Sequence, residues 1–146
     1  MHPDTTPVDQ PAELVHRLCR AVNDHDLDAV VDCFATDYVN ETPVHPARGF
    51  VGVEQVRGNW TQIFGGVPDI AAEVTGIAVD GGTVWSEWEH RGTRRDGSLH
   101  HMRGVVILEV DDGRARRARF YLEPVDEVSG GVDEAVRRQV APRALA

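Results

Sequence analysis

Residues 83–123 read TVWSEWEHRGTRRDGSLHHMRGVVILEVDDGRARRARFYLE, and the prediction of the fold starts there. Apolar and polar side chains alternate along most of this stretch, which indicates strands. Its two interruptions, Asp96-Gly97 and Asp111-Asp112-Gly113, contain the Asp and Gly residues that accept the positive φ angles of hairpin turns. The stretch therefore predicts three consecutive antiparallel strands at 83–94, 99–110 and 114–123.

The period of the pattern changes on the N-terminal side of this meander. A fourth strand is predicted at 70–79, and Asp80-Gly81-Gly82 forms the hairpin that joins it to the next one. Before it, apolar residues recur at helical spacing in three segments, 11–22, 27–34 and 53–64. Three helices followed by an antiparallel meander predict an α+β fold with the helices packed on one face of the sheet.

The remaining segments set the predicted domain boundaries. A short strand is expected at 38–41, and the two prolines and the glycine of 42–49 indicate an irregular loop. One domain is expected at 11–125, between a flexible lead-in at 1–10 and a tail at 126–146 that contains a short helix near 131–140.

Composition limits the classes of function. The chain has 146 residues, of which 41% are hydrophobic and 27% charged, as in a single soluble globular domain. The formal net charge of −9 disfavours binding to nucleic acid or to anionic membranes. All the cationic side chains are arginines, and Cys19 and Cys33 are expected to be reduced, buried apolar residues. Residues 1–11 lack the features of a signal peptide, so the cytoplasm is the expected compartment.

Alternation along the strands divides the side chains between two faces. The predicted inner face is the more apolar one, and the outer face contains charged residues with Trp85 and Tyr121. The predicted inner residues are Val84, Ser86, Trp88, His90, Met102, Gly104, Val106, Leu108, Val110, Ala118, Phe120 and Leu122. An apolar interior with a few polar groups suits a small-molecule pocket, and it suits a filled core equally well.

The order of elements and four local motifs resemble the nuclear-transport-factor-2-like superfamily, specifically its SnoaL-like polyketide cyclase branch. The motifs are the Asn23-x-x-Asp26-Leu27 turn, FATDYV at 34–39, GVEQVR at 52–57 and RFYLEP at 119–124. The resemblance implies a curved antiparallel sheet wrapped by the three N-terminal helices into a cone with a deep pocket. It also implies a homodimer formed through the outer sheet face. Because this fold hosts several chemistries and pure binding modules, the resemblance does not define the reaction.

The catalytic motifs of two enzyme groups within the superfamily are missing. In the steroid isomerase relatives an aspartate base precedes the loop proline, where this chain has Thr42 before Pro43. The oxyanion-binding tyrosine of the same group falls at Leu18. The inward Arg-x-Asp pair and the final Asp of the limonene epoxide hydrolase relatives fall at Trp88, His90 and Phe120. Both chemistries are therefore disfavoured.

His90 is the leading catalytic candidate, because a neutral imidazole on the inner face can exchange protons near pH 7. Glu41 and His45, at the mouth of the predicted cone, are the candidates to assist it. The predicted substrate-binding residues are Trp88, Tyr38, Trp60, Phe64, Arg48, Phe120 and Met102. A hydrogen-bonded core histidine, a solvated loop and ordinary core aromatics would produce the same pattern.

Other polar residues are expected to serve the surface. His100, His101 and the arginines of 114–117 flank turns and are predicted to be exposed. Tyr121, Arg119 and Glu123 are predicted to form a network at the dimer face, unless a bulge reverses the faces of the last strand. No metal-ligand spacing, phosphate loop or nucleophile motif is visible, so a cofactor-independent activity is expected.

Two hypotheses follow. The first is a cofactor-free cyclase, isomerase or dehydratase that acts on a hydrophobic polyketide-like or terpenoid-like molecule, with His90 moving the proton. The second is a non-catalytic ligand-binding or dimeric accessory protein that retains the cone without its acid–base groups. Loss of turnover in His90→Gln would support the first, and an unmodified co-purifying ligand would support the second.

Overall fold

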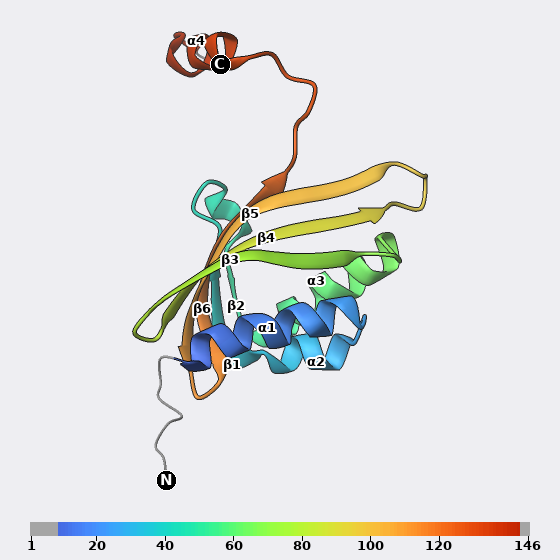
Figure 1. Ribbon diagram of the computed structural model, residues 1–146, viewed down its shortest axis with the longest axis vertical. Coiled ribbons are helices and arrows are strands. Elements are labelled where there is room, and N and C mark those ends of the chain that lie inside the picture. The colour runs from blue at the N-terminus through green and yellow to red at the C-terminus, as the bar shows by residue number, and fades with distance from the viewer. Residues whose placement is uncertain (1–8, 144–146) are drawn as a thin grey trace.

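The computed structural model describes residues 9–143. Its strands form one six-stranded sheet in the order β2-β1-β6-β5-β4-β3, with helices covering one face (Figure 1). The strands are β1 (Phe34–Glu41), β2 (Phe50–Val51), β3 (Ala71–Asp80), β4 (Thr83–Thr93), β5 (Leu99–Asp111) and β6 (Arg114–Pro124). The helices are α1 (Asp9–Asn23), α2 (Leu27–Asp32), the 3₁₀ turn η1 (Pro46–Arg48), α3 (Val53–Gly66) and α4 (Val132–Val140). The α+β prediction is therefore confirmed.

Most of the predicted element boundaries are within two residues of the observed ones, and β1 is the exception. It begins at Phe34, four residues before the predicted start, and it pairs in parallel with β6 whereas every other pairing is antiparallel. The register shifts between Phe34 and Val39. This irregularity interrupts the alternation that would have indicated a longer strand.

The turn between α1 and α2 fixes the helical layer to the edge of the sheet. His25 ends α1 with a left-handed φ of 53°, and Asp26 caps α2 by accepting a hydrogen bond from the Ala29 amide at 3.1 Å. The Asn23 side chain accepts a hydrogen bond from the Ala72 amide at 2.7 Å and donates one to the Ala72 carbonyl at 2.9 Å. The side-chain amide thus satisfies both backbone groups of Ala72 on the edge strand β3, as a neighbouring strand would.

The core lies between α1, α2, α3 and the inner face of the sheet. It contains the apolar stripes that the helical spacing predicted, including Leu14, Leu18 and Val22 of α1 and Val30 of α2. On β4 the inner residues Val84, Ser86, Trp88 and His90 are all buried, as alternation predicts. Cys19 and Cys33 are free thiols, and desolvation raises the pKa of each; Cys33 is buried as expected, whereas Cys19 is only half-buried.

The strands β5 and β6 approach each other unusually closely at Gly104. A Cβ atom at this position would collide with the backbone of Tyr121 and Leu122, and the residue has a φ of 154°. Only glycine fits there, which explains the single glycine in the apolar inner face of β5. The close approach lies beside the part of β6 that borders the functional site.

The C-terminal segment leaves the body of the molecule after β6. Figure 1 shows α4 standing apart from the sheet and from the other helices. The tail predicted at 126–146 does contain a helix, although residues 144–146 are outside the described part. Residues 1–8 of the predicted lead-in are also outside it, whereas residues 9 and 10 belong to α1. In the described range, no helix has the length and apolar character needed to span a bilayer.

Candidate functional site

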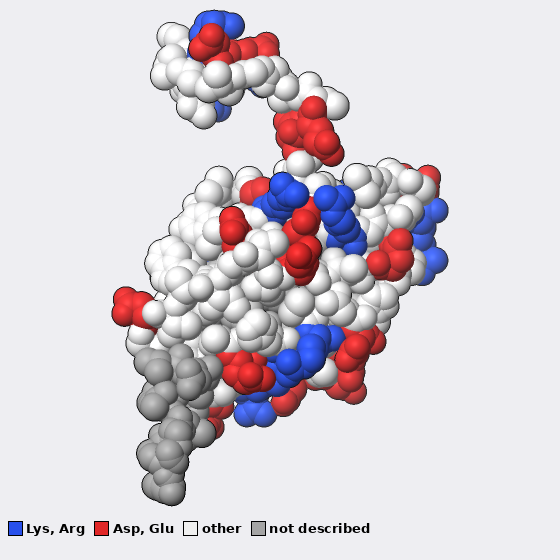
Figure 2. Space-filling model, in the orientation of Figure 1, with Lys and Arg blue, Asp and Glu red and all other residues white. Residues whose placement is uncertain are grey.

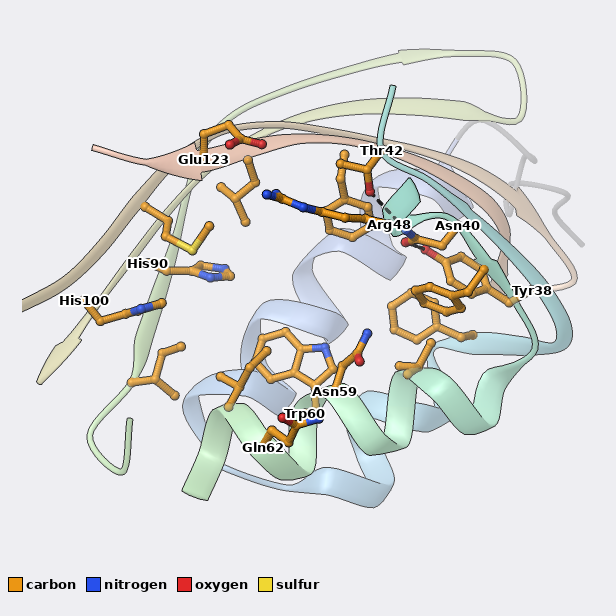
Figure 3. Close-up of a pocket in the computed structure, with 18 residues that line it drawn as sticks. Tyr38, Asn40, Thr42, Arg48, Asn59, Trp60, Gln62, His90, His100 and Glu123 are labelled. Atoms are coloured by element: carbon orange, nitrogen blue, oxygen red, sulfur yellow. Dashed lines mark hydrogen bonds between the residues drawn. The ribbon is translucent and has the colours of Figure 1, made fainter. Parts of the chain in front are cut away.

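A cavity of about 500 Å³ lies between the inner face of the sheet and α3 (Figure 3). Apolar side chains form most of its wall: Phe34, Tyr38, Phe50, Val56, Trp60, Ile63, Ile70, Met102, Phe120 and Leu122. The polar side chains that line it are Asn40, Thr42, Arg48, Asn59, Gln62, His90, His100 and Glu123. The space on the inner face is therefore only partly filled by core side chains.

His90 lies on β4 in the wall of this cavity, opposite Met102 of β5. Its residue surface is only 8% exposed, and the rings of Trp88 and Trp60 lie 5.8 Å and 6.2 Å away in edge-on arrangements. Burial, and secondarily the charge of His100, lowers the pKa of His90 to about 4. The imidazole is therefore neutral at pH 7.

Within residues 9–143, no side chain or backbone group forms a hydrogen bond with the imidazole of His90, whose backbone pairs with β3 and β5. Among the described residues, Nδ1 of His101 is inaccessible to solvent and forms no hydrogen bond. The ring nitrogens of His90 also lack a protein hydrogen bond, but they are not closed off in this way. The nitrogens of His90 therefore retain access to the cavity, where Figure 3 shows the ring pointing. A buried polar group is normally satisfied, so a free imidazole at a cavity wall suits a ligand.

A short polar chain occupies the β1 side of the cavity. The Tyr38 hydroxyl donates a hydrogen bond to Asn40 Oδ1 at 2.7 Å, and Asn40 Nδ2 lies 3.4 Å from Thr42 Oγ1. Burial raises the pKa of Tyr38 strongly, so its hydroxyl stays protonated and remains a donor. The chain presents neutral hydrogen-bonding groups beside an apolar wall.

The rim of the cavity is formed by the loop after β1 and by the end of β6. His45 Nε2 lies 3.1 Å from Glu123 Oε1 and connects these two segments. The pairing of β1 with β6 ends at Glu41 and Arg119, so the last residues of β6 have no neighbour on that side. This free edge allows Glu123 to reach the rim although β6 keeps its register with β5 through Pro124. No reversal of the faces is needed.

The structure divides the predicted site residues into two groups. Those that line the cavity are His90, Tyr38, Trp60, Arg48, Phe120 and Met102. Those outside the lining are Trp88, Phe64, Glu41 and His45. Trp88 belongs to the core cluster, and the ring centroids of Phe64 and Trp60 lie 5.4 Å apart. Glu41 pairs with Arg117 at 3.0 Å, whereas His45 approaches the cavity through Glu123.

Several cavity residues were not predicted. His100 lines the cavity and His101 is nearly buried beside Glu89 at 2.6 Å, so the prediction that this pair is exposed was wrong. The strands β4 and β5 extend as a long hairpin past the helices, which places His100 on the inner face diagonally from His90. Continuing the alternation from Met102 back to His100 would have found it.

Asn59 and Gln62 of α3 were missed for a different reason. Trp60 and Ile63 mark the apolar stripe of this helix, and the two amides flank that stripe. Helical spacing alone assigns such flanking residues to solvent. Among residues 9–143 there is no group of three or more His, Cys, Asp or Glu side chains arranged to hold a metal ion.

The sheet and the helices that wrap its inner face define a nuclear-transport-factor-2-like cone, and comparison with known proteins supports this class. A SnoaL-like domain matches residues 15–118, and the chain therefore belongs to the SnoaL-like family. The resemblance noted from the sequence motifs is confirmed. No curated protein matches the sequence.

Solved structures with the same fold come from proteins of several names. A candidate ketosteroid isomerase from Kribbella flavida is 22% identical, with a TM-score of 0.67 and coverage of 97% of this chain and 95% of that chain. An epoxide hydrolase of M. tuberculosis, described as LEH-like, is 20% identical, with a TM-score of 0.70 and coverage of 81% and 86%. IdmH, a candidate polyketide cyclase of Streptomyces antibioticus, is 24% identical, with a TM-score of 0.68 and coverage of 78% and 92%. Similarity at this level establishes the fold and leaves the reaction open.

Proposed function

We propose that the protein is a cofactor-independent acid–base enzyme, a cyclase, isomerase or dehydratase, that acts on a hydrophobic polyketide-like or terpenoid-like small molecule. The single observation that supports this most is His90, a buried neutral imidazole with no protein hydrogen bond at the wall of a mainly apolar cavity. The similarity to structures named as isomerase, epoxide hydrolase and polyketide cyclase is consistent with it.

In the proposed reaction His90 acts as the general base. A nitrogen of its neutral ring takes a proton from a carbon next to a carbonyl group of the substrate, which leaves an imidazolium and an enolate. The imidazolium then returns the proton to another atom of the same molecule, so an isomerisation or cyclisation is balanced without a further reactant. In a dehydration the proton goes to the departing hydroxyl group.

The surroundings of His90 suit this role. A pKa of about 4 makes the free imidazole a weak base, but an enolate next to the ring favours its protonated form and raises that pKa during the reaction. The amides of Asn59 and Gln62 also line the cavity and can stabilise the enolate oxygen. His45 assists by holding Glu123 at the rim. Glu41, which pairs with Arg117, has the weakest support for an assisting role.

We further propose a homodimer that forms through the outer face of the sheet. Trp85 and Tyr121 lie on that face with 47% and 37% of their surface exposed. Exposed aromatic side chains of this kind are typical of protein interfaces. On the side of the molecule in Figure 2, acidic and basic side chains are interspersed, without a broad field of one sign.

The test is proton exchange at a carbon acid, which requires no knowledge of the natural substrate. The protein should accelerate deuterium incorporation at the α-carbon of α-tetralone in D₂O, measured by mass spectrometry. His90→Gln should lose about 10²- to 10³-fold of the catalysed rate, because a positioned general base contributes on this scale. The matched control is His16→Gln, an exposed histidine of α1, which should retain the full rate.

The same experiment separates enzyme from binding module. Quenching of tryptophan fluorescence reports binding of α-tetralone, since Trp60 lines the cavity. Binding without any acceleration of exchange would contradict the enzyme and support the accessory ligand-binding protein. Full exchange activity in His90→Gln would remove His90 from the mechanism.

A further inference from the structure

Arg48 differs from the other arginines of the folded body. Within residues 9–125, the other arginine side chains contact an acidic side chain or a backbone carbonyl, except for Arg116. Arg48 and Arg116 have no such partner among the described residues. Of these two, only Arg48 lines the cavity that contains His90. Arg48 is exposed to solvent, and a cation at the wall of an apolar cavity is available to bind an anion.

The backbone of Arg48 is held in place at the mouth of the cavity. It is the last residue of the 3₁₀ turn η1, where the Arg48 amide donates to the His45 carbonyl at 2.9 Å and the Gly49 amide donates to the Pro46 carbonyl at 3.2 Å. The contact between His45 and Glu123 connects this turn to the end of β6. Figure 3 shows the Arg48 side chain extending from the turn into the cavity, toward His90 and Glu123.

The acidic side chain that shares the cavity with Arg48 already contacts His45. Glu123 is the only carboxylate among the cavity residues, and its Oε1 atom lies against His45. No ion pair joins Arg48 to Glu123 within the described part of the chain. The histidines that share the cavity are His90, which is neutral at pH 7, and His100, whose pKa is lowered by burial. Arg48 is therefore the one permanent positive charge that a bound molecule would meet there.

The opposite end of the cavity has the reverse character. Phe34, Tyr38 and Phe50 lie there in edge-on contact, with ring centroids 4.8 Å and 6.0 Å apart along the series. A molecule that fills the cavity would place an apolar ring system on these aromatics and a polar end near Arg48. With a net charge of −9 the protein repels anions at long range, so it needs a local cation to retain one.

We propose that the ligand of this cavity is an apolar carboxylic acid, and that Arg48 determines this specificity by binding its carboxylate. A guanidinium matches a carboxylate with two parallel hydrogen bonds, which no other cavity side chain provides. The proposal rests on the proposed function only in taking the cavity as a ligand site. It orients the substrate with its acid at the Arg48 guanidinium and its rings at the aromatic end.

The experiment compares two probes of nearly equal shape, naphthylacetate and its neutral amide naphthylacetamide. Their dissociation constants are measured at pH 7.5 by tryptophan fluorescence and by calorimetry, on the unmodified protein and on variants. The unmodified protein should bind the carboxylate about tenfold more tightly than the amide. Arg48→Gln should abolish this preference with little change for the amide, and Arg48→Lys should retain part of it. Arg116→Gln, the other unpaired arginine, is the matched control and should leave the preference intact.

Three outcomes would overturn the proposal: equal affinity of the unmodified protein for both probes, no binding of either probe, or an acid preference that survives in Arg48→Gln. A preference that disappears in His100→Gln and persists in Arg48→Gln would assign anion binding to His100 instead. Binding needs no turnover, so a failed exchange experiment with His90→Gln leaves this result unaffected. In the same way, a failed test of Arg48 leaves the exchange experiment unaffected, because α-tetralone has no carboxylate.

Discussion

Two neighbouring sites on the inner face of β4 are both buried but differ in their hydrogen bonding. The first site, outside the cavity lining, is the pair Ser86 and Trp88. Trp88 Nε1 donates to Ser86 Oγ at 2.8 Å, and Ser86 Oγ donates to the Val106 carbonyl at 2.7 Å. Every polar atom of this pair is satisfied. The second site is His90, which lines the cavity. It is also buried, yet its imidazole has no hydrogen-bond partner among the described residues.

Burial alone does not distinguish a core residue from a site residue. Ser86, Trp88 and His90 are 1%, 3% and 8% exposed and follow the same alternation. What differs is the presence of a hydrogen-bond partner. A polar pair that is fully hydrogen-bonded stabilises the core, whereas a polar group without a partner is free to bind a ligand. Changes at Ser86 or Trp88 should therefore affect stability, and changes at His90 should affect function and pH response.

The largest effect on stability is expected from Trp88→Ala. Removing this buried indole leaves a cavity in the core and should lower the free energy of unfolding by about 3–5 kcal/mol. Trp60→Ala, at the cavity wall, should cost clearly less, because one side of that indole already faces open space. Urea unfolding followed by circular dichroism measures both. Equal losses of unfolding free energy would contradict the distinction between the core position of Trp88 and the cavity-wall position of Trp60.

The second effect is a pH dependence that His90 contributes. The folded state binds a proton at His90 near pH 4 and the unfolded chain near pH 6.5, so between these values the unfolded state holds more protons. The free energy of unfolding should therefore fall on acidification through this window, by at most about 3 kcal/mol from this group. His90→Leu should remove that part of the fall.

The measurement is urea unfolding of both proteins at several pH values between 7 and 4. Carboxylates with lowered pKa values, such as Asp69 and Asp96, also lose stabilising interactions in acid, but they are common to both proteins. The informative quantity is the difference between the two curves. Parallel curves would show that His90 titrates normally and that its ring reaches solvent.

The third effect concerns the satisfied pair. Ser86→Ala removes the acceptor of the Trp88 Nε1 hydrogen and leaves a buried donor unpaired, which should cost about 1–3 kcal/mol. Thr75→Ala on the outer side of β3 provides the control, because its hydroxyl is exposed and should contribute less than about 0.5 kcal/mol. A loss for Ser86→Ala as small as that of the control would mean that water replaces the missing acceptor.

Alternation and turn chemistry were sufficient to predict the sheet and the inner face of β4. They predicted the place of His90 because a strand with period two leaves only one choice of face. They did not predict that Trp88 belongs to the core and Trp60 to the cavity wall, since both satisfy the same apolar pattern. That difference depends on where α1 and α3 cover the sheet, which is a tertiary property.

The rim of the site was the least predictable part. Glu123 reaches it because β1 stops pairing with β6 at Arg119, and no local sequence signal marks where that pairing ends. The contact of His45 with Glu123 joins residues 78 positions apart. The loop at 42–49 was predicted as irregular, but its sequence does not show that it meets the end of β6 through this contact.

The smallest effect on stability, with a local consequence, is expected from His45→Ala. The contact with Glu123 is partly exposed, so its loss should change the free energy of unfolding by less than about 1 kcal/mol. The amides of Arg48 and Gly49, which donate within η1, should nevertheless exchange with deuterium faster. Hydrogen exchange with mass spectrometry of peptides covering 42–52 measures this.

Glu41→Gln is the matched control for that prediction. The pair of Glu41 with Arg117 has similar exposure and sits at the base of the same loop, but it connects β1 to β6 and not the turn to the rim. It should leave the exchange of η1 unchanged. If His45→Ala also left the exchange of the η1 amides unchanged, the paired strands β1 and β2 would hold the turn by themselves. The contact of His45 with Glu123 would then serve only to keep that carboxylate away from Arg48. In that case the sheet would fix the position of Arg48. His45 would still be needed to bind Glu123 and leave the Arg48 guanidinium available for an anion.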